Sequence, residues 1–296
     1  MERPFDVVIV GYITIDVNTM PWGVIENMLG GPPTYAGFTL DKLGKRVGIV
    51  SKVGTDFPEK FPLVYSRIGL DTEGIMTIGP ETTTFENIYD EAGNREQKCK
   101  PITAKITPDD IPQIYKDAAC FYISPVADEI TPELVETLKS NGGKVMLDPQ
   151  GLFRKVGNDG KVRVQHRDDL ADFLANVDIV KLGLEELKAF AGEPKDALEK
   201  LRGMGPDIAI ATRGGDRCVM VSKDGYLEID PLKVEAKDLT GAGDVFGAAF
   251  IAKYMENEDP LDSAHYAMAA AGLKIRYKGP TGFPTDEEIR EAMKTQ

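Results

Sequence analysis

Cysteine, histidine and tryptophan are scarce in this chain of 296 residues, which contains three, two and one of them. Cys99, Cys120 and Cys218 lie too far apart for a C-x-x-C metal or redox motif. Their odd number favours a reducing compartment, with each thiol packed in the interior. With only His166 and His265 present, metal or triad chemistry based on histidine has few candidates. His265 lies in an apolar segment predicted to be helical, and we expect a structural role for it.

Several features of other protein classes are also missing. No apolar run approaches the roughly 20 residues of a membrane-spanning helix. Residues 1–4 lead straight into a predicted strand without the pattern of a secretory signal, so we expect a cytoplasmic protein. The formal net charge of −13 argues against a broad surface for nucleic acid or anionic membranes. The P-loop pattern G-x-x-x-x-G-K-[ST] does not occur, which excludes that form of phosphate binding.

The pattern of predicted elements indicates an α/β protein with a parallel sheet. Apolar runs such as Phe5–Gly11 and Asp207–Thr212 are typical of strands buried on both faces, and they alternate with predicted helices. The stretch from Ile75 to Cys99 departs from this alternation. Its polar residues alternate on either side of a loop suited to a hairpin, which predicts a small antiparallel sheet acting as a lid over the main domain.

The stretch Asp238–Asp244, Asp-Leu-Thr-Gly-Ala-Gly-Asp, joins glycines to the start of an apolar helix. Gly241 and Gly243 let the backbone turn sharply and approach a ligand, and the amides at a helix start attract phosphate. Asp244 is then suited to accept a proton from a hydroxyl group that attacks the phosphate. A tight turn followed by an acid that complements the helix dipole is the alternative. The dinucleotide fingerprint G-x-G-x-x-G is excluded because Phe246 occupies its third glycine position.

Further candidates for substrate binding lie near predicted strand ends and in the lid. They are Asp16, Gly30, Gly31, Glu86, Asn87 and Gln150. Asp16 and Gln150 come just past strands, where ligands bind in open parallel sheets. The glycine pair precedes a helix, where it lets the backbone lie against a substrate or serves only as a hinge. For the polar residues, a solvated surface position is the alternative.

These motifs follow one another in the same order as in the ribokinase-like (PfkB) carbohydrate kinases, which the chain resembles over nearly its whole length. The resemblance rests on Gly30-Gly31, the hairpin, Thr212-Arg213-Gly214 and Asp238–Asp244, in which Leu239 stands where the family often has Thr. It implies a single three-layer α/β/α domain over residues 1–296, with lid segments within about 12–29 and 75–103. It further implies ATP as phosphoryl donor, Mg²⁺, a hydroxyl acceptor on a small polyol or sugar, and a homodimer formed through the lid.

Site residues follow from this resemblance position by position. Asp244 would be the catalytic base, and the amides of Gly241, Ala242 and Gly243 would form the anion hole. The residues implied in binding ATP are Thr212, Gly214, Thr240, Gly241, Gly243, Lys278 and Gly279. The family's N-x-x-E element, which places Mg²⁺ through water, falls on residues 183–186. Gly183 replaces its amide, and Glu186 is retained as the metal residue.

A closer likeness connects residues 84–89, 148–154 and 277–280 with myo-inositol kinases of thermophiles. A cyclitol presents neutral hydroxyl groups, which Asp16, Asn87 and Gln150 are suited to bind without a charged clamp. We therefore expect an ATP-dependent kinase of a small polyol, with myo-inositol as the leading acceptor. A nucleoside, ribose or other sugar kinase is the alternative, although no aromatic residue for stacking on a base is evident near Asp16. A sugar-binding protein without catalysis also stays open, because Gly183 departs from the metal element.

Overall fold

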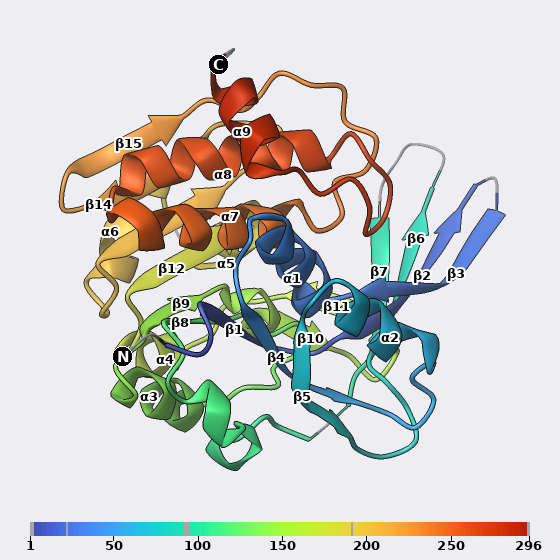
Figure 1. Cartoon of the computed structure of the whole chain (residues 1–296). Coiled ribbons are helices and arrows are strands. Elements are labelled where there is room, and N and C mark those ends of the chain that lie inside the picture. The colour runs from blue at the N-terminus through green and yellow to red at the C-terminus, as the bar shows by residue number, and fades with distance from the viewer. Residues whose placement is uncertain (1–2, 22, 91–94, 103, 191, 295–296) are drawn as a thin grey trace.

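In the part of the chain that the structure describes, the large sheet has nine strands, in the order β15-β14-β13-β12-β9-β8-β1-β4-β5 (Figure 1). The computed structural model describes residues 3–21, 23–90, 95–102, 104–190 and 192–294. The strands are β1 Val7–Val10, β4 Val47–Val53, β5 Asp71–Thr77, β8 Cys120–Ile123, β9 Lys144–Leu147, β12 Ile179–Gly183, β13 Ile208–Thr212, β14 Cys218–Ser222 and β15 Gly225–Ile229. Pairing is parallel from β13 to β5 and antiparallel for β14 and β15. The predicted, mostly parallel sheet is confirmed.

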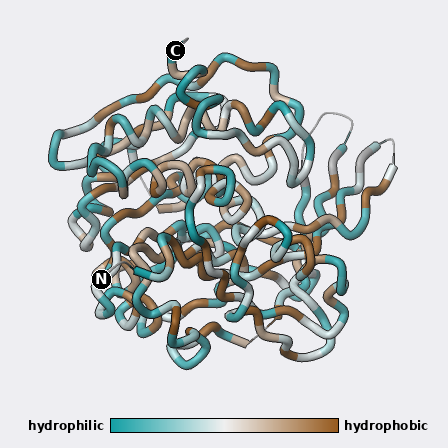
Figure 2. Tube along the Cα trace, viewed as in Figure 1, coloured by the Kyte–Doolittle hydropathy of each residue, from teal (hydrophilic) through white to brown (hydrophobic). Residues whose placement is uncertain are grey.

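Helices cover both faces of this sheet because its strands are apolar on both sides. Val7 and Ile9 of β1 belong to one buried core, and Val8 and Val10 belong to the other. The first core also holds residues of α1 Pro32–Lys42, α2 Lys60–Arg67, α7 Ala242–Asn257, α8 Pro260–Lys274 and α9 Asp286–Met293. The second holds residues of α3 Pro132–Ser140, α4 Leu170–Leu174, α5 Leu184–Phe190 and α6 Pro194–Arg202. Hydrophobic segments concentrate along the central strands, as Figure 2 shows. The result is the predicted three-layer arrangement.

A smaller sheet projects from one side of the molecule, at the right of Figure 1. Its strands lie in the order β3-β2-β6-β7 and are β2 Thr14–Met20, β3 Gly23–Gly30, β6 Thr84–Tyr89 and β7 Arg95–Lys100. The hairpins β2–β3 and β6–β7 are antiparallel, whereas β2 and β6 pair in parallel. The sheet is therefore mixed, because two hairpins from distant parts of the chain join along one strand of each.

Some elements differ from the sequence predictions. Strand β5 was not predicted from the sequence. Arg167, just before α4, pairs with Asp128 and Asp169. The remaining elements are the pair β10 Arg154–Val156 and β11 Val162–Val164, and the 3₁₀ helices η1 Pro108–Asp110, η2 Gln113–Tyr115 and η3 Pro149–Leu152. None of the helices within the described ranges is long and apolar enough to cross a membrane.

Candidate active site

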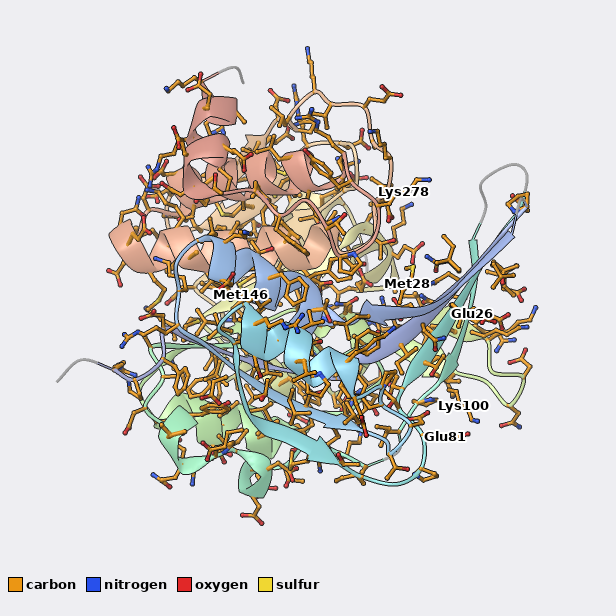
Figure 3. All side chains as sticks on the ribbon, turned by 45° about the vertical axis from the view of Figure 1, so that its right-hand side comes forward. Glu26, Met28, Glu81, Lys100, Met146 and Lys278 are labelled. Atoms are coloured by element: carbon orange, nitrogen blue, oxygen red, sulfur yellow. The ribbon has the colours of Figure 1, made fainter. Side chains whose placement is uncertain are left out.

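A cavity of about 590 Å³ lies between the small sheet and the start of α7. Of the predicted site residues, Asp16, Gly31 and Asn87 line it on the side of the small sheet. Those that line it from the body of the molecule are Gln150, Thr240, Gly241, Asp244, Lys278 and Gly279. Figure 3 shows two lining residues that approach from these opposite sides, Met28 of β3 and Lys278 beyond α8. Segments far apart in the sequence thus meet at one cavity.

The wall formed by the small sheet consists of polar side chains on one face of its strands. Asp16 comes just past β1, as expected, and lies within β2, because this second strand begins only four residues after β1 ends. Thr14 Oγ1 donates to Asp16 Oδ1 at 2.8 Å. Asn87 Nδ2 donates to Asn18 Oδ1 at 2.9 Å, and Gln97 Nε2 donates to Asn87 Oδ1 at 2.9 Å. These hydrogen bonds orient the amides before any ligand is bound.

Two residues predicted to bind substrate do not line the cavity. Glu86 precedes Asn87 in β6, and successive side chains of a strand point to opposite faces. Its carboxylate lies 3.6 Å from Lys98 Nζ with 41% of the side chain exposed. Gly30 has a supporting position instead, because a Cβ atom there would lie 2.5 Å from Asp16 Oδ2. The absence of a side chain at Gly30 leaves room for the Asp16 carboxylate.

The start of α7 has the turn that the glycine motif predicts. Gly241 has a φ of 74°, and a Cβ atom there would lie 2.1 Å from Tyr35 Cδ1, so the position requires glycine. The Ala242 N–H donates to the Leu239 carbonyl at 3.2 Å, and the first bond of the helix runs from Val245 N–H to Gly241 O. The Ala242 amide is therefore occupied, and neither Ala242 nor Gly243 lines the cavity, contrary to part of the predicted anion hole.

Asp244, in the first turn of α7, keeps some surface toward the cavity and is otherwise enclosed by protein. Its pKa is raised to about 7, first because burial disfavours the carboxylate and next because the charge of Asp148 is near. Lys181, Arg154 and the Gln150 amide act in the opposite direction. A carboxylate that titrates near neutral pH is well matched to a general base.

Gln150 is already engaged with protein groups on both ends of its amide. Its Nε2 lies within hydrogen-bonding distance of Ser124 Oγ, at 3.2 Å, and of Asp244 Oδ1, at 3.3 Å. Its Oε1 accepts from Arg154 Nη2 at 2.8 Å. Gln150 therefore orients the Asp244 carboxylate, in addition to any contact with substrate.

Arg154 and Phe85 are lining residues to which the sequence analysis gave no role. The Arg154 guanidinium lies 5.6 Å from the centre of the Phe85 ring, and its Nη1 donates to the Val126 carbonyl at 3.3 Å. A guanidinium thus lines the cavity beside the polar residues that were expected to bind a neutral acceptor. Phe85 lies opposite Asp16 in the pairing of β6 with β2, so an aromatic residue is present beside Asp16 after all. Only the strand pairing reveals this neighbour.

The residues predicted to bind ATP fall into two groups. Thr240 and Gly279 lie together, because the two Asp238 carboxylate oxygens accept their N–H groups at 2.9 and 2.7 Å. Thr212 and Gly214 do not line the cavity. Thr212 ends β13, where its Oγ1 donates to the Leu182 carbonyl at 3.4 Å, and Gly214 follows in the next turn with a φ of 63°.

Glu186, the predicted metal residue, lies in the first turn of α5, buried and outside the cavity. Burial is the main cause that raises its pKa. A Cβ atom at Gly183 would lie 2.5 Å from Glu186 Oε2, so glycine at 183 leaves room for this carboxylate. Within the described ranges, no group of three or more His, Cys, Asp or Glu side chains is placed to hold a metal. A single carboxylate still fits Mg²⁺, which usually keeps several waters and binds substrate phosphates.

Comparison with known proteins agrees with this geometry. The model of the pfkB family carbohydrate kinases matches residues 6–287. The chain belongs to this family. It is similar to a cytidine kinase of Thermococcus kodakarensis, with 29% identity over 87% of this chain and 91% of the relative. An inositol 3-kinase of Arabidopsis thaliana is 26% identical over 94% of this chain and 76% of the relative.

The solved structures show the same fold. A pyrophosphate-dependent kinase of the ribokinase family, complexed with a pyrophosphate analog and myo-inositol, has a TM-score of 0.82 and 21% identity over 97% of this chain and 99% of that chain. The ribokinase-like α/β fold is thus confirmed. As a pfkB family member the chain is a carbohydrate kinase, so the alternative of a sugar-binding protein without catalysis is set aside. The acceptors named for its relatives differ from one another.

Proposed function

We propose that this pfkB family kinase transfers a phosphoryl group from ATP to a hydroxyl group of a small neutral polyol, with myo-inositol as the leading acceptor. The observation that carries the proposal is the position of Asp244. Its carboxylate lines the same cavity as the polar face of the small sheet and lies in the first turn of α7. An acceptor hydroxyl at this point would meet a base and a phosphate-binding helix start together.

Asp244 acts as the base in the proposed transfer. The acceptor hydroxyl gives its proton to the Asp244 carboxylate while its oxygen forms the new bond to the terminal phosphorus of ATP. The bond from that phosphorus to the bridging oxygen breaks, and ADP leaves with the electron pair. The Ala242 amide already donates to Leu239, so the amides that follow it in the first turn of α7, those of Gly243 and Asp244, would stabilise negative charge on the phosphoryl group.

Residues on the α7 side are proposed to hold the nucleotide. Thr240 and Gly241 would contact phosphates, and Lys278 and Gly279 line the cavity next to them. Mg²⁺ would neutralise phosphate charge, with Glu186 held toward it through water. Glu186 supplies the single carboxylate that this arrangement needs.

The wall of the small sheet supports a neutral acceptor rich in hydroxyl groups. Asn18, Asn87 and Gln97 present amides, and Asp16 presents a carboxylate that can accept two hydrogen bonds from neighbouring hydroxyls. The relationship to a plant inositol 3-kinase is consistent with such an acceptor.

A nucleoside is the second candidate, and Phe85 is the observation that favours it. The ring lines the cavity beside Asp16, where an aromatic face can contact a base while a carboxylate binds ribose hydroxyls. The cytidine kinase relative supports this alternative. Arg154 lies over the ring, so a base would have to share Phe85 with a guanidinium.

A panel of acceptors and donors tests the proposal. ADP release with ATP and Mg²⁺ is measured with myo-inositol, ribose, fructose and cytidine, and phosphate release is measured with pyrophosphate as donor. Efficient turnover of myo-inositol with ATP supports the leading proposal, whereas a higher kcat/KM for cytidine supports the second. Turnover with pyrophosphate as donor and none with ATP would reject ATP as the donor.

A further inference from the structure

Lys181 and Asp148 form a buried ion pair beneath the cavity, and the sequence analysis assigned neither to the site. Lys181 Nζ lies 2.6 Å from Asp148 Oδ2, and only 4% and 2% of the two side chains are exposed. The strand register explains the contact. Val180 of β12 lies opposite Leu147 of β9, so the next residues along these parallel strands are Lys181 and Asp148. Neither residue lines the cavity itself.

Lys181 also contacts the start of α7 directly. Its Nζ donates to the Gly243 carbonyl at 3.1 Å, and a Cβ atom at Gly243 would lie 3.0 Å from Nζ. The peptide unit that begins with this carbonyl ends with the amide nitrogen of Asp244. Because a peptide unit is planar, a bond that holds its oxygen also fixes the direction of its N–H. The ammonium therefore helps to set the direction of the Asp244 amide and the position of its Cα atom.

Fold stability alone does not explain a lysine in the middle of β12. The strand reads Ile-Val-Lys-Leu-Gly, and Lys181 is buried with its apolar neighbours. Replacing a buried ion pair by apolar residues is often neutral or stabilising, so such a pair is weak evidence of a purely structural role. Contact with the turn that carries Asp244 gives a functional reason for keeping this charge.

The charges around Asp244 come from several elements. Asp148 directly follows β9, Lys181 lies in the middle of β12, and Arg154 begins β10. Tyr122 lies on β8 with its hydroxyl 3.5 Å from Asp148 Oδ2. Asp148 raises the pKa of Asp244, whereas Lys181 and Arg154 lower it. The carboxylates of Asp148, Asp244 and Glu186 all favour the charged form of Lys181. One buried ammonium thus balances a group of acids.

We propose that Lys181, paired with Asp148, is a positioning residue of the transfer site: its ammonium fixes the Gly243–Asp244 peptide and supplies positive charge that balances Asp148 and Asp244. The effect on turnover rests on the proposed function. The charge and environment of Asp244, in contrast, are measurable without any substrate.

The test compares Lys181→Met, Asp148→Asn and the double variant by two measurements. The first is the titration of the Asp244 ¹³Cγ resonance, assigned by its loss in Asp244→Asn. The second is the pH profile of kcat and KM with the best acceptor. In Lys181→Met, Asp148 is unopposed, so the pKa of Asp244 is expected to rise by about one unit or more. Displacement of the peptide is expected to lower kcat by about 10- to 100-fold, with a smaller change in KM.

The double variant separates charge from hydrogen bonding. Asp148 raises the pKa of Asp244 and Lys181 lowers it. Because the double variant lacks both charges, the pKa of Asp244 is expected to return toward its wild-type value. The Gly243 carbonyl still lacks its donor, so kcat is expected to stay low. Asp148→Asn alone keeps the ammonium and is expected to lower the pKa of Asp244.

Lys52→Met is the matched control. Lys52 Nζ lies 2.7 Å from Asp110 Oδ2, with 6% and 16% of the two side chains exposed, and the residue does not line the cavity. This variant is expected to unfold at lower temperature but to keep the wild-type titration of Asp244 and the wild-type kcat. It measures the cost of losing a buried ion pair elsewhere in the same fold.

The proposal is overturned if Lys181→Met leaves the Asp244 titration unchanged and lowers kcat no more than Lys52→Met does. If Lys181→Met does not fold, the double variant, which buries no unpaired charge, decides by its kcat: a wild-type value overturns the proposal. Wild-type protein without turnover on any acceptor would contradict the proposed function instead. The titration would then decide alone whether Lys181 controls Asp244.

Discussion

The two walls of the cavity differ in charge and in the way they are held. On the α7 side, Asp244 lies among Asp148, Lys181 and Arg154, next to the central strands of the large sheet. On the other side, the small sheet presents amides, such as Asn87, that hydrogen-bond to one another. The cluster of charged groups therefore lies next to the large sheet, whereas the projecting small sheet (Figure 1) carries mainly neutral amides and the single carboxylate of Asp16.

This difference indicates a division of work. Groups that handle developing charge gain from burial, because electrostatic interactions strengthen where water is excluded. Groups that recognise hydroxyls need only donors and acceptors that point in the right directions. Hydrogen-bonded amides supply these without the cost of burying a charge. Variants on the α7 side are therefore expected to change kcat and the pH profile, and variants on the small sheet are expected to change the KM of the acceptor.

The largest effect is expected for Asp244→Asn. The amide cannot accept the hydroxyl proton, so kcat is expected to fall by about 10²- to 10⁴-fold, the usual contribution of a general base. Binding of ATP and acceptor, measured by calorimetry, is expected to persist because the shape of the site is kept. Wild-type kcat in this variant would remove Asp244 from the mechanism.

The same variant is expected to be more stable than the wild type at alkaline pH. The pKa of Asp244 is raised from 3.8 to about 7 in the folded protein, so between these values the folded state binds the proton more strongly than the unfolded state. Stability from this group is therefore lost as pH rises from about 4 to about 7. Asparagine avoids this loss. The melting temperature of the variant should exceed that of the wild type at pH 8, and the difference should shrink toward pH 4.

Much of this architecture could be predicted from the sequence. Apolar runs such as residues 5–11 identified the buried strands, and the glycines of Asp238–Asp244 identified the start of α7, because each pattern has few structural solutions. Strand β5 was missed because its sequence, Asp-Thr-Glu-Gly-Ile-Met-Thr, is mostly polar. Its pairing with β4 depends on tertiary context, which overrides local propensity.

The site could be predicted less completely because it depends on strand register. The sequence shows Glu86 and Asn87 side by side, but only the pairing of β6 decides which of them faces the cavity. Lys181 had a signal that could have been used, since a lysine interrupts the apolar run of β12. Its partner Asp148 directly follows a strand more than 30 residues earlier, so the pair appears only once the sheet is assembled.

Asn87→Ala and Glu86→Ala form a matched test of the small sheet. Asn87 lines the cavity and bonds to Asn18 and Gln97, so its loss is expected to raise the KM of the acceptor about 5- to 30-fold, the equivalent of one or two hydrogen bonds. The KM of ATP and kcat are expected to change little. Glu86→Ala removes an exposed partner of Lys98 and is expected to leave both KM values unchanged. Equal effects of the two variants would contradict the assignment of faces.

Gln150→Leu is expected to have the smallest effect. It removes only the amide that lies between Asp244 on the α7 side and Arg154, whose guanidinium lies over Phe85 of the small sheet. The Gln150 amide lowers the pKa of Asp244, and its Oε1 is held by Arg154. Without that hydrogen bond the pKa of Asp244 rises, so the limb on which kcat increases with pH is expected to move to higher pH by less than about one unit. The rate should fall a few-fold near pH 7 and recover above pH 8, where Asp244 is ionised in both proteins. A uniform loss at every pH would show instead that Gln150 contacts the acceptor and does not tune the base.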